Sequence, residues 1–354
     1  MAVSDSALIS GDKTSQPLSP PRTWSNHFLH YKSVLHHPWY KHMIKVQHEI
    51  HMALHEYFTS KGLITVSMPI TTASISSPMG LGSDSLPVEI DLFGVKTYLA
   101  DSMQFMLEFG CRLHQQGVYY IMPCFRGEQT DHYHLAQFYH VEAEIPGTLS
   151  DVMQLVNEMI HHLSSRMLDR CADSIEAIVG NLNHVQQLVD LHAQYPQHRM
   201  DEIIHSLQQE NPQWVHRHAA GFTQITREGE KELIRRNGGK PVWLTHFDHL
   251  AVPFYQAYEQ ETGKALNADL LLGTCETVGS GQRHITSTQV RTALQHHTVH
   301  EEPYSWYLAM RDEISLETSG FGMGLERYLL WLFQHDDIRD FPLLHRENGA
   351  VILP

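Results

Sequence analysis

Apolar residues recur along the first third of the chain at spacings typical of helices and strands. Residues 38–61 carry apolar side chains on one face of a predicted helix, which ends at Gly62. The next stretch, LITVSMPI, predicts a strand that cannot continue through Pro69. The pattern then predicts a helix over residues 102–116, preceded by a hairpin that turns near Gly94 in VEIDLFGVKTYLA.

Two more predicted strands flank a polar loop. The first, VYYIMPCFR, ends at Arg126, and the second is LAQFYHVEAEI. The second strand alternates between an apolar face and a face that bears carboxylates. These faces carry Tyr139, Val141, Ala143 and Ile145 on one side and Phe138, His140, Glu142 and Glu144 on the other. The alternation predicts a sheet floor beneath a polar cleft, although an amphipathic surface strand would show the same pattern.

The remaining pattern predicts one domain that carries a helical insertion. Residues 1–23 are rich in Ser and Pro and predict a disordered tail, so the domain is expected to span residues 24–354. Residues 150–237 are mostly helical in pattern and form the predicted insertion. A strand at WLTHF, a helix near residues 253–262 and a helix after Gly324 complete the expected elements.

The composition is that of an ordinary globular protein, with 354 residues of which 42% are hydrophobic and 18% charged. No apolar run reaches the ~18 residues of a membrane span, and no secretory signal is recognisable. The four cysteines are scattered without paired spacing, which favours a reducing cytoplasm. A net charge of −15 without a Lys/Arg-rich stretch argues against a large nucleic-acid surface, and binding of DNA is not expected.

The first candidate for chemistry is a strand–loop–strand segment with an arginine and an aromatic residue. It contains FRGE, which begins at Phe125, and HLAQF, which ends at Phe138. An arginine such as Arg126 can bind a phosphate with two hydrogen bonds, and an aromatic ring can stack on a base. By itself, the pair of Arg126 and Glu128 is equally typical of a protein surface.

The second candidate is the segment GFGMGLER, which spans residues 320–327. Its glycines allow a close approach of the backbone and stand before a predicted helix. The spacing GxGxG and the position near the end of the chain do not fit a dinucleotide-binding fold. Arg327 lies in the first turn of the predicted helix, where the helix dipole adds to its attraction for an anion.

The third candidate is a pair of carboxylates, Asp269 and Glu276. If Leu272 and Gly273 form the turn of a hairpin, the two acids lie opposite each other, with Cβ atoms about 4.5–5.5 Å apart. Such a pair is stabilised by a cation, and Mg²⁺ together with the phosphates of ATP is the natural candidate. Two solvent-separated surface acids would show the same spacing.

These three candidates, in this order, resemble the class II aminoacyl-tRNA synthetases. The segments around Arg126 and Arg327 are similar to the second and third signature motifs, and the helix and strand around Gly62 are similar to the first, which forms a dimer interface in the family. The aspartyl/asparaginyl branch is resembled further in DSMQFMLE, HVEAEI, DLLLGTCETVGSGQRH, SWYLAMRDE and DIRDFP. The resemblance covers about residues 24–346 and implies an α+β fold, with an antiparallel sheet flanked by helices, and a homodimer.

The resemblance also implies roles for individual residues in the activation of an amino acid by ATP and Mg²⁺. Arg126 and Arg327 would be the catalytic arginines, on the α-phosphate and the γ-phosphate. Glu128, His134 and Phe138 would contact the nucleotide, with Phe138 stacked on adenine. The implied metal ligands are Asp269 and Glu276, and the implied amino-acid pocket contains Ser102, Gln104, Leu107 and Arg283.

Several positions depart from the family pattern and leave the activated acid open. Leu107 stands where the aspartyl enzymes have a lysine, and Tyr133 and Gln137 replace an arginine and a glutamate. Met79 aligns near a glutamate that binds the amino group of the substrate, a role that Asp84 could take. These changes affect recognition of the amino acid more than the adenylation step.

The acyl acceptor is the last open question. The anticodon-binding barrel of the branch does not fit into the 23-residue tail, which, with the negative charge, makes binding of tRNA doubtful. The leading expectation is therefore an ATP-dependent ligase that makes an amide, such as asparagine from aspartate and ammonia. Transfer of the amino acid to tRNA or to a carrier protein is the alternative, and a non-catalytic binding paralogue is a third possibility.

Overall fold

A central sheet of eight strands organises the chain. In a computed structural model, which describes residues 17–26, 28–76, 81 and 85–352, the strand order is β1-β5-β6-β15-β14-β13-β10-β7. Every neighbouring pair from β5 to β10 is antiparallel, whereas β1 and β7 join the two edges in parallel. In sheet order, the strands are Ile64–Thr65, Val118–Phe125, Gln137–Pro146, Thr318–Gly324, Cys275–Gln282, Asn267–Leu272, Val242–Thr245 and Gln197–Arg199. The expected α+β fold with an antiparallel sheet is confirmed.

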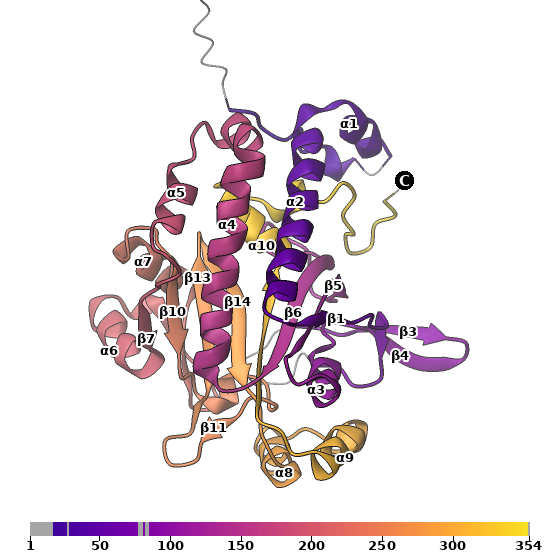
Figure 1. Cartoon of the computed structure of the whole chain (residues 1–354), viewed down its shortest axis with the longest axis vertical. Coiled ribbons are helices and arrows are strands. Elements are labelled where there is room, and N and C mark those ends of the chain that lie inside the picture. The colour runs from indigo at the N-terminus through magenta and orange to yellow at the C-terminus, as the bar shows by residue number, and fades with distance from the viewer. Residues whose placement is uncertain (1–16, 27, 77–80, 82–84, 353–354) are drawn as a thin grey trace, which may run out of the picture.

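Two long helices, α2 (Pro38–Ser60) and α4 (Leu149–Val179), lie side by side across one face of the sheet (Figure 1). Helix α2 begins with a proline, whose missing N–H costs nothing in the first turn, and ends before Gly62, which has a φ of 82°. With α10 (Leu325–Leu332), these helices bury Trp39, Met159 and Trp243 in the main core. Because α4 packs on the sheet itself, the helical segment predicted as an insertion contributes directly to this core.

On the opposite face of the sheet, the described helices lie at its two ends, with a cleft between them. At one end lie α3 (Gln104–Leu113), α8 (Ser287–His296) and α9 (Ser305–Glu313), with two small apolar cores. At the other end lie α6 (Met200–Glu210) and α7 (Arg227–Arg236), which share a separate core with Leu244 and Leu271. The cleft therefore has a wall from each of two separately packed groups of helices.

Shorter elements complete the described chain. A hairpin projects from the body in Figure 1 and turns at Phe93 and Gly94, whose φ values of 56° and 83° are typical of a two-residue turn. This hairpin and the strand at WLTHF are confirmed. The remaining helices and strands are α1 (His30–His36), α5 (Asn183–Val189), β2 (Thr71–Thr72), β3 (Val88–Leu92), β4 (Val95–Leu99), β8 (Val215–Arg217), β9 (Thr223–Ile225), β11 (Tyr258–Glu259) and β12 (Lys264–Ala265).

Two predicted elements differ from the structure. Only Ile64–Thr65 of LITVSMPI pairs with a neighbouring strand, so this strand is much shorter than the apolar pattern predicts. The helix predicted near residues 253–262 is wrong, because this stretch forms turns and the hairpin β11–β12. Its apolar residues point into the core beside α9 from irregular backbone, which imitates helical spacing in the sequence.

The segment before residue 24 also differs from expectation in its described part. The Leu18 N–H donates a hydrogen bond of 2.8 Å to the Ala177 carbonyl, and Nε of Arg22 donates one of 3.1 Å to Asp340. Residues 17–23 therefore lie against the domain and are not a disordered tail. Residues 1–16 lie outside the described residues, and the predicted domain boundaries stay predictions. Among the described helices, none combines the length and hydropathy needed to cross a membrane.

Candidate active site

Two adjoining cavities open in the cleft, on the face of the sheet opposite α2 and α4. Both are lined by Arg126, His140, Glu276 and Gly322, so the cavities meet at these residues. The first, called here the nucleotide cavity, is also lined by Glu128, Tyr133, His134, Phe138, Glu326 and Arg327. The second, called the amino-acid cavity, is also lined by Asp101, Ser102, Gln104, Glu142, Glu230, Gln256, Asp269 and Arg283.

Arg126 stands at the end of β5, where the two cavities meet. Its backbone N–H donates a hydrogen bond of 3.0 Å to the Ala136 carbonyl, which fixes the loop between β5 and β6. Its guanidinium carbon lies 5.4 Å from the centre of the Phe138 ring, and Nη1 is 4.0 Å from Oε1 of Glu128. The buried Nε has no hydrogen-bond partner among the described residues. An unsatisfied, positively charged donor at this junction is suited to bind an anion.

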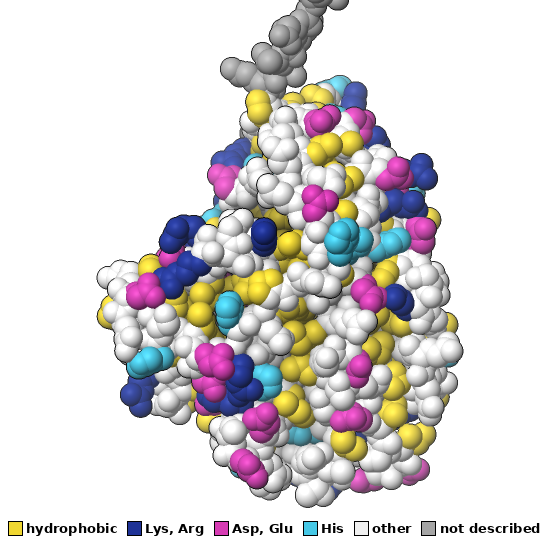
Figure 2. Space-filling view, turned by 60° about the vertical axis from the view of Figure 1, so that its left-hand side comes forward, with side chains coloured by type: hydrophobic (Ala, Val, Ile, Leu, Met, Phe, Trp, Pro, Cys, Tyr) yellow, Lys and Arg dark blue, Asp and Glu magenta, His cyan; other side chains and the backbone are white. Residues whose placement is uncertain are grey.

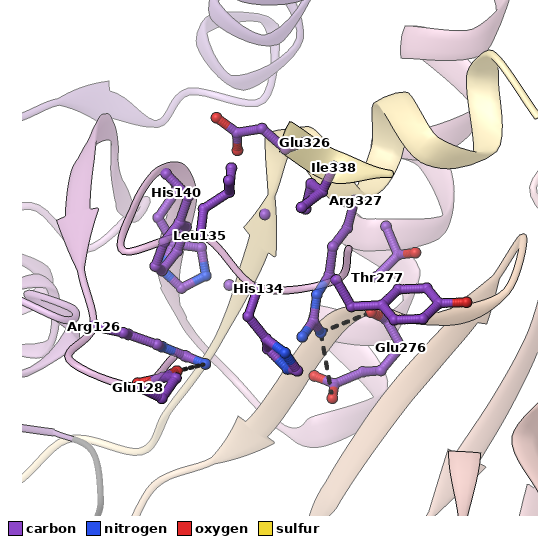
Figure 3. A pocket seen from close by; sticks show the side chains of 14 residues that line it. Arg126, Glu128, His134, Leu135, His140, Glu276, Thr277, Glu326, Arg327 and Ile338 are labelled. Atoms are coloured by element: carbon purple, nitrogen blue, oxygen red, sulfur yellow. Dashed lines mark hydrogen bonds and ion pairs between the residues drawn. The ribbon is translucent and has the colours of Figure 1, made fainter. Parts of the chain in front are cut away.

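Arg327 reaches the nucleotide cavity from the start of α10. Figure 3 shows Arg126 and Arg327 on opposite sides of the cavity, with His134 between them. Nη1 of Arg327 donates a hydrogen bond of 2.9 Å to the Glu276 carbonyl and lies 3.8 Å from its carboxylate. His134 is held by Asp131, whose Oδ1 is 2.9 Å from the His134 Nδ1. Two cations and an imidazole thus surround a space that an aromatic ring, Phe138, lines.

The structural reason for the glycines of GFGMGLER differs from the predicted one. Gly320 and Gly322 lie in β15, beside β6. A Cβ atom on Gly320 would stand 1.8 Å from Oε2 of Glu144, and one on Gly322 would stand 2.8 Å from Nε2 of His140. These glycines make room for buried side chains of the neighbouring strand, and the helix begins only after Gly324.

The two predicted metal ligands lie in the expected hairpin but in a different register. Glu276 pairs with Leu271 because the turn lies at Gly273 and Thr274, one residue later than predicted, and a β-bulge next to Leu271 then pairs Asp269 with Gly279. The carboxylates nevertheless approach each other across Gly279. A Cβ atom built there would lie 3.1 Å from Oε1 of Glu276 and 3.7 Å from Oδ1 of Asp269. The predicted opposition of the two residues is wrong, while their proximity is preserved.

The chemistry of this pair fits a hard divalent cation. Burial, followed by the charges of Glu276 and Glu230, raises the pKa of Asp269 well above its usual range. Accumulated negative charge of this kind is relieved by a bound cation. In the described part of the chain, no three His, Cys, Asp or Glu side chains are arranged to hold a metal alone. The pair therefore suits Mg²⁺, which commonly takes one or two carboxylates together with phosphate oxygens of a substrate.

Buried carboxylates dominate the amino-acid cavity. The hydroxyl of Ser102 donates a hydrogen bond to Glu142, with Oγ 2.7 and 2.8 Å from its two oxygens. Burial raises the pKa of Glu142 to about 8. The guanidinium of Arg283 is bound by Glu144, with Nη2 3.0 Å from Oε2, so its charge is already balanced. Among the described residues that line this cavity, Arg126 is therefore the one arginine without a hydrogen bond to a carboxylate.

Leu107 is the one proposed site residue that lines neither cavity. Its side chain is fully buried in an apolar core on α3, with Ala100, Cys111 and Val118, and it lines neither cavity. It lies on the apolar face of α3, whereas Gln104, at the start of the helix, lines the cavity. The interpretation of position 107 as a specificity residue is therefore corrected.

Several polar cavity residues were not predicted from the sequence, among them Glu230, Gln256 and Asp101. Glu230 comes from α7, in the segment where no chemical signature is recognisable, and it meets Asp269 only in the folded chain. Gln256 lies in the stretch predicted as a helix, and its buried Oε1 has no partner among the described residues. Asp101 precedes Ser102 and accepts hydrogen bonds from Ser76, the closer one 2.9 Å long. Met79 and Asp84, considered above for the amino group, lie outside the described residues.

A comparison with known protein families identifies the family of this chain. A family described as tRNA synthetases class II (D, K and N) matches residues 28–347 of the chain. The chain belongs to this family. It is accordingly an ATP-dependent ligase with a class II synthetase fold, as predicted.

Relatives of this chain are asparaginyl enzymes. It is 27% identical to the asparagine–tRNA ligase of Thermus thermophilus over 362 residues, which cover 98% of the chain and 79% of that ligase. The human asparaginyl-tRNA synthetase is 28% identical over 327 residues, which cover 84% of the chain and 65% of the human protein. Among solved structures, the asparaginyl-tRNA synthetase of Pyrococcus horikoshii complexed with asparaginyl-adenylate superposes with a TM-score of 0.82, at 24% identity over 95% of this chain and 74% of that one.

These similarities change the ranking of the functions predicted above. They support an asparaginyl-tRNA ligase-like enzyme, which was the alternative, better than synthesis of asparagine from ammonia, which was the leading expectation. The doubt about tRNA binding is not supported by them. The homodimer and the roles of the individual site residues stay predictions.

Proposed function

We propose that this chain activates asparagine with ATP and transfers the asparaginyl group to tRNA. The observation that carries the proposal is the junction of the two cavities at Arg126. A reaction between a nucleotide and an amino acid requires both substrates to meet at one point, with a positive charge beside the reacting phosphorus. Arg126 is the one guanidinium that lines both cavities among the described residues.

In this proposal, the first step is an attack of the asparagine carboxylate on the α-phosphorus of ATP, and pyrophosphate leaves. Arg126 would bind the α-phosphate and the attacking carboxylate, which brings two anions together and stabilises the charge of the transition state. Phe138 would stack on the adenine, and Glu128 and His134 would contact the nucleotide. Arg327 would bind the γ-phosphate from the other side of the cavity.

Asp269 and Glu276 would hold Mg²⁺ in this reaction. When bound, Mg²⁺ neutralises charge on the phosphate groups and helps to orient them. The donor set described above supports this assignment, because two crowded carboxylates supply only part of a coordination shell. Glu230 lies nearby and, when ionised, adds to the negative potential at the pair.

The amino-acid cavity favours a neutral amide side chain over a carboxylate. The charge of Arg283 is balanced by Glu144, and the proposal assigns Arg126 to the reacting groups, so no arginine in the described lining is left to pair with a side-chain carboxylate. The Oε1 of Gln256 is a buried acceptor without a donor. An amide NH₂ group can satisfy that acceptor, whereas an ionised carboxylate has no proton to donate. Asparagine therefore fits this cavity better than aspartate does.

Transfer to tRNA is proposed from the relatives, several of which are named asparagine–tRNA ligases. On the face shown in Figure 2, Lys and Arg side chains are interspersed with Asp and Glu side chains. A contact with tRNA on such a surface would depend on local patches, and its affinity should fall with increasing salt.

The first test is amino-acid-dependent exchange of pyrophosphate into ATP, with asparagine, aspartate and lysine supplied separately. We expect exchange with asparagine, and we expect Arg126→Ala to lower its rate at least about a hundredfold, as the loss of one transition-state contact does. Arg235→Ala is the matched control, because Arg235 is an exposed arginine of α7 that is paired with Glu232. Full exchange activity in Arg126→Ala would refute the role of the junction.

The second test identifies the acceptor. The enzyme is incubated with ATP, Mg²⁺ and each amino acid, together with either total tRNA or ammonium. Asparaginyl-tRNA as the product supports the proposal. Formation of free asparagine from aspartate and ammonium would instead establish the amide-forming ligase that the sequence first suggested.

A further inference from the structure

An arginine that has no ion pair with any described residue stands beside the nucleotide cavity, on an element that the proposed reaction does not use. Arg227 is the first residue of α7, and its guanidinium carbon lies 4.2 Å from the centre of the Tyr133 ring. Tyr133 belongs to the loop between β5 and β6 and lines the nucleotide cavity. The contact therefore connects α7 directly to the wall of that cavity.

The other cations of α7 are already paired, whereas Arg227 is not. Lys231 lies 2.9 Å from Glu228, and Arg235 and Arg236 both bind Glu232. Across the described residues, Arg227 has no ion pair within 4.0 Å, and its contact is the face of an aromatic ring. A cation–π contact holds a guanidinium in place without neutralising its charge. Arg227 thus remains available to an anion.

The surroundings of Arg227 show which anion is suitable. Burial and the nearby Glu276 raise the pKa of Glu230 to about 7, and the charges of Arg327 and Arg227 oppose that rise. Arg227 therefore acts on Glu230, and α7 packs against β13 and β14, the strands that carry the carboxylates proposed to hold Mg²⁺. Glu230 follows Arg227 by three residues on α7, a spacing that places both on one face of the helix. A polyanion that reaches the metal would also come within reach of this arginine.

The nucleotide cavity needs another positive charge. Its lining carries Arg126 and Arg327 against Glu128, Glu276 and Glu326, and Arg327 already contacts Glu276. A triphosphate adds several negative charges, most of them on the two phosphates that leave as pyrophosphate. We infer that Arg227 binds the β- and γ-phosphates of ATP and the departing pyrophosphate, and that it thereby couples α7 to the bound nucleotide. This inference rests on the proposed function only in taking ATP as the substrate.

Equilibrium binding separates this role from a structural one. The full chain is titrated with ATP, AMP and pyrophosphate in the presence of Mg²⁺, without any amino acid. Arg227→Ala should weaken binding of ATP and pyrophosphate about ten- to a hundredfold and change the affinity for AMP by less than about twofold, as expected for the loss of one charge-assisted contact. Arg227→Lys should give an intermediate loss, because it keeps the charge but not the planar fork.

Lys231→Ala is the matched control. Its Nζ lies 6.0 Å from the centre of the same Tyr133 ring, but it is paired with Glu228, and its removal should leave all three affinities unchanged. Equal losses of AMP and ATP affinity in Arg227→Ala would assign the residue to packing of the loop and overturn the inference. An unchanged affinity for ATP, or the same loss in Lys231→Ala, would also overturn it.

The experiments distinguish a failure of the inference about Arg227 from a failure of the proposed function. If the chain exchanges pyrophosphate with none of the amino acids tested, but Arg227→Ala still loses triphosphate affinity selectively, the inference about Arg227 stands and the proposed reaction does not. If exchange with asparagine is present and the selective loss is not, the reverse holds.

Discussion

Replacing Leu107 by lysine separates two interpretations of one position. Alignment with aspartyl enzymes would place a lysine at 107 in the amino-acid pocket, where it should favour an acidic substrate. In the structure, the side chain is fully buried in the apolar core of α3 and lines neither cavity. The adjacent Glu108 cannot accept the new cation without cost, because Tyr307 and Arg311 already bind it. We therefore expect Leu107→Lys to affect stability and not specificity.

The magnitude follows from the burial. Keeping a lysine neutral at pH 7 against a normal pKa of about 10.4 costs about 4–5 kcal/mol, at ~1.36 kcal/mol per pKa unit. The lysine stem replaces part of the lost leucine packing, so the total remains close to this figure. Such a loss is a large fraction of the ~5–15 kcal/mol that stabilises a typical domain, and in a chain of this length it should lower Tm by roughly 5–7 °C.

Thermal and urea unfolding of Leu107→Lys and of Leu107→Met provide the measurement. The methionine variant conserves volume and should lose less than about 1.5 kcal/mol. Since burial lowers the pKa of the introduced lysine below its unfolded value, the folded state binds fewer protons, and the deficit should shrink as the pH rises from about 7 to about 10. A lysine variant with wild-type stability and a preference for aspartate would refute the reasoning and return position 107 to the pocket.

Three further predictions concern the metal pair, a buried acid and the N-terminal segment. Asp269→Asn removes a proposed metal ligand and should raise the Mg²⁺ concentration needed for half-maximal exchange about tenfold or more. Its Tm should be unchanged or higher, because repulsion from Glu276 is relieved. An unchanged Mg²⁺ dependence would show that Asp269 does not bind the metal. Burial raises the pKa of Glu142 to about 8, so the folded chain retains a proton that the unfolded chain releases. Stability should therefore fall as the pH rises from about 4.5 to about 8. Urea unfolding of Glu142→Gln across this range should show a weaker dependence of stability on pH. Asp340 is fully buried and accepts hydrogen bonds from Arg22 and Trp24. Asp340→Ala should therefore lower the free energy of unfolding by about 2–3 kcal/mol and speed hydrogen exchange in residues 17–25. Unchanged exchange would mean that other contacts hold this segment.

Local patterns were sufficient where neighbouring residues alone decide the structure. The alternation along β6 identified its two faces, and Gly62 marked the end of α2. The residues around Arg126 and Phe138 could be paired from the sequence because a short loop joins their two strands. Short-range geometry of this kind depends little on the remainder of the chain.

Features that depend on distant segments were not predictable in the same way. The register of Asp269 and Glu276 was wrong because the turn lies one residue later than predicted and because the extra residue of a β-bulge leaves no trace in the alternation of polar and apolar positions. Glu230 lies about forty residues before Asp269 and joins it only through the packing of α7. Leu107 was misplaced because an alignment indicates which residue is equivalent but not the direction in which its side chain points.

Gly320 and Glu144 occupy a single shared volume in the core. The carboxylate of one strand fills the space where the neighbouring strand would place a side chain, and it meets the guanidinium of Arg283 there. Neither position can therefore change independently: any side chain at 320 displaces the carboxylate, and a shorter residue at 144 leaves both a void and an unpaired cation. Variation at the two sites should be correlated in natural and designed sequences, so that a larger residue at 320 is tolerated only together with a smaller one at 144 and a neutral residue at 283.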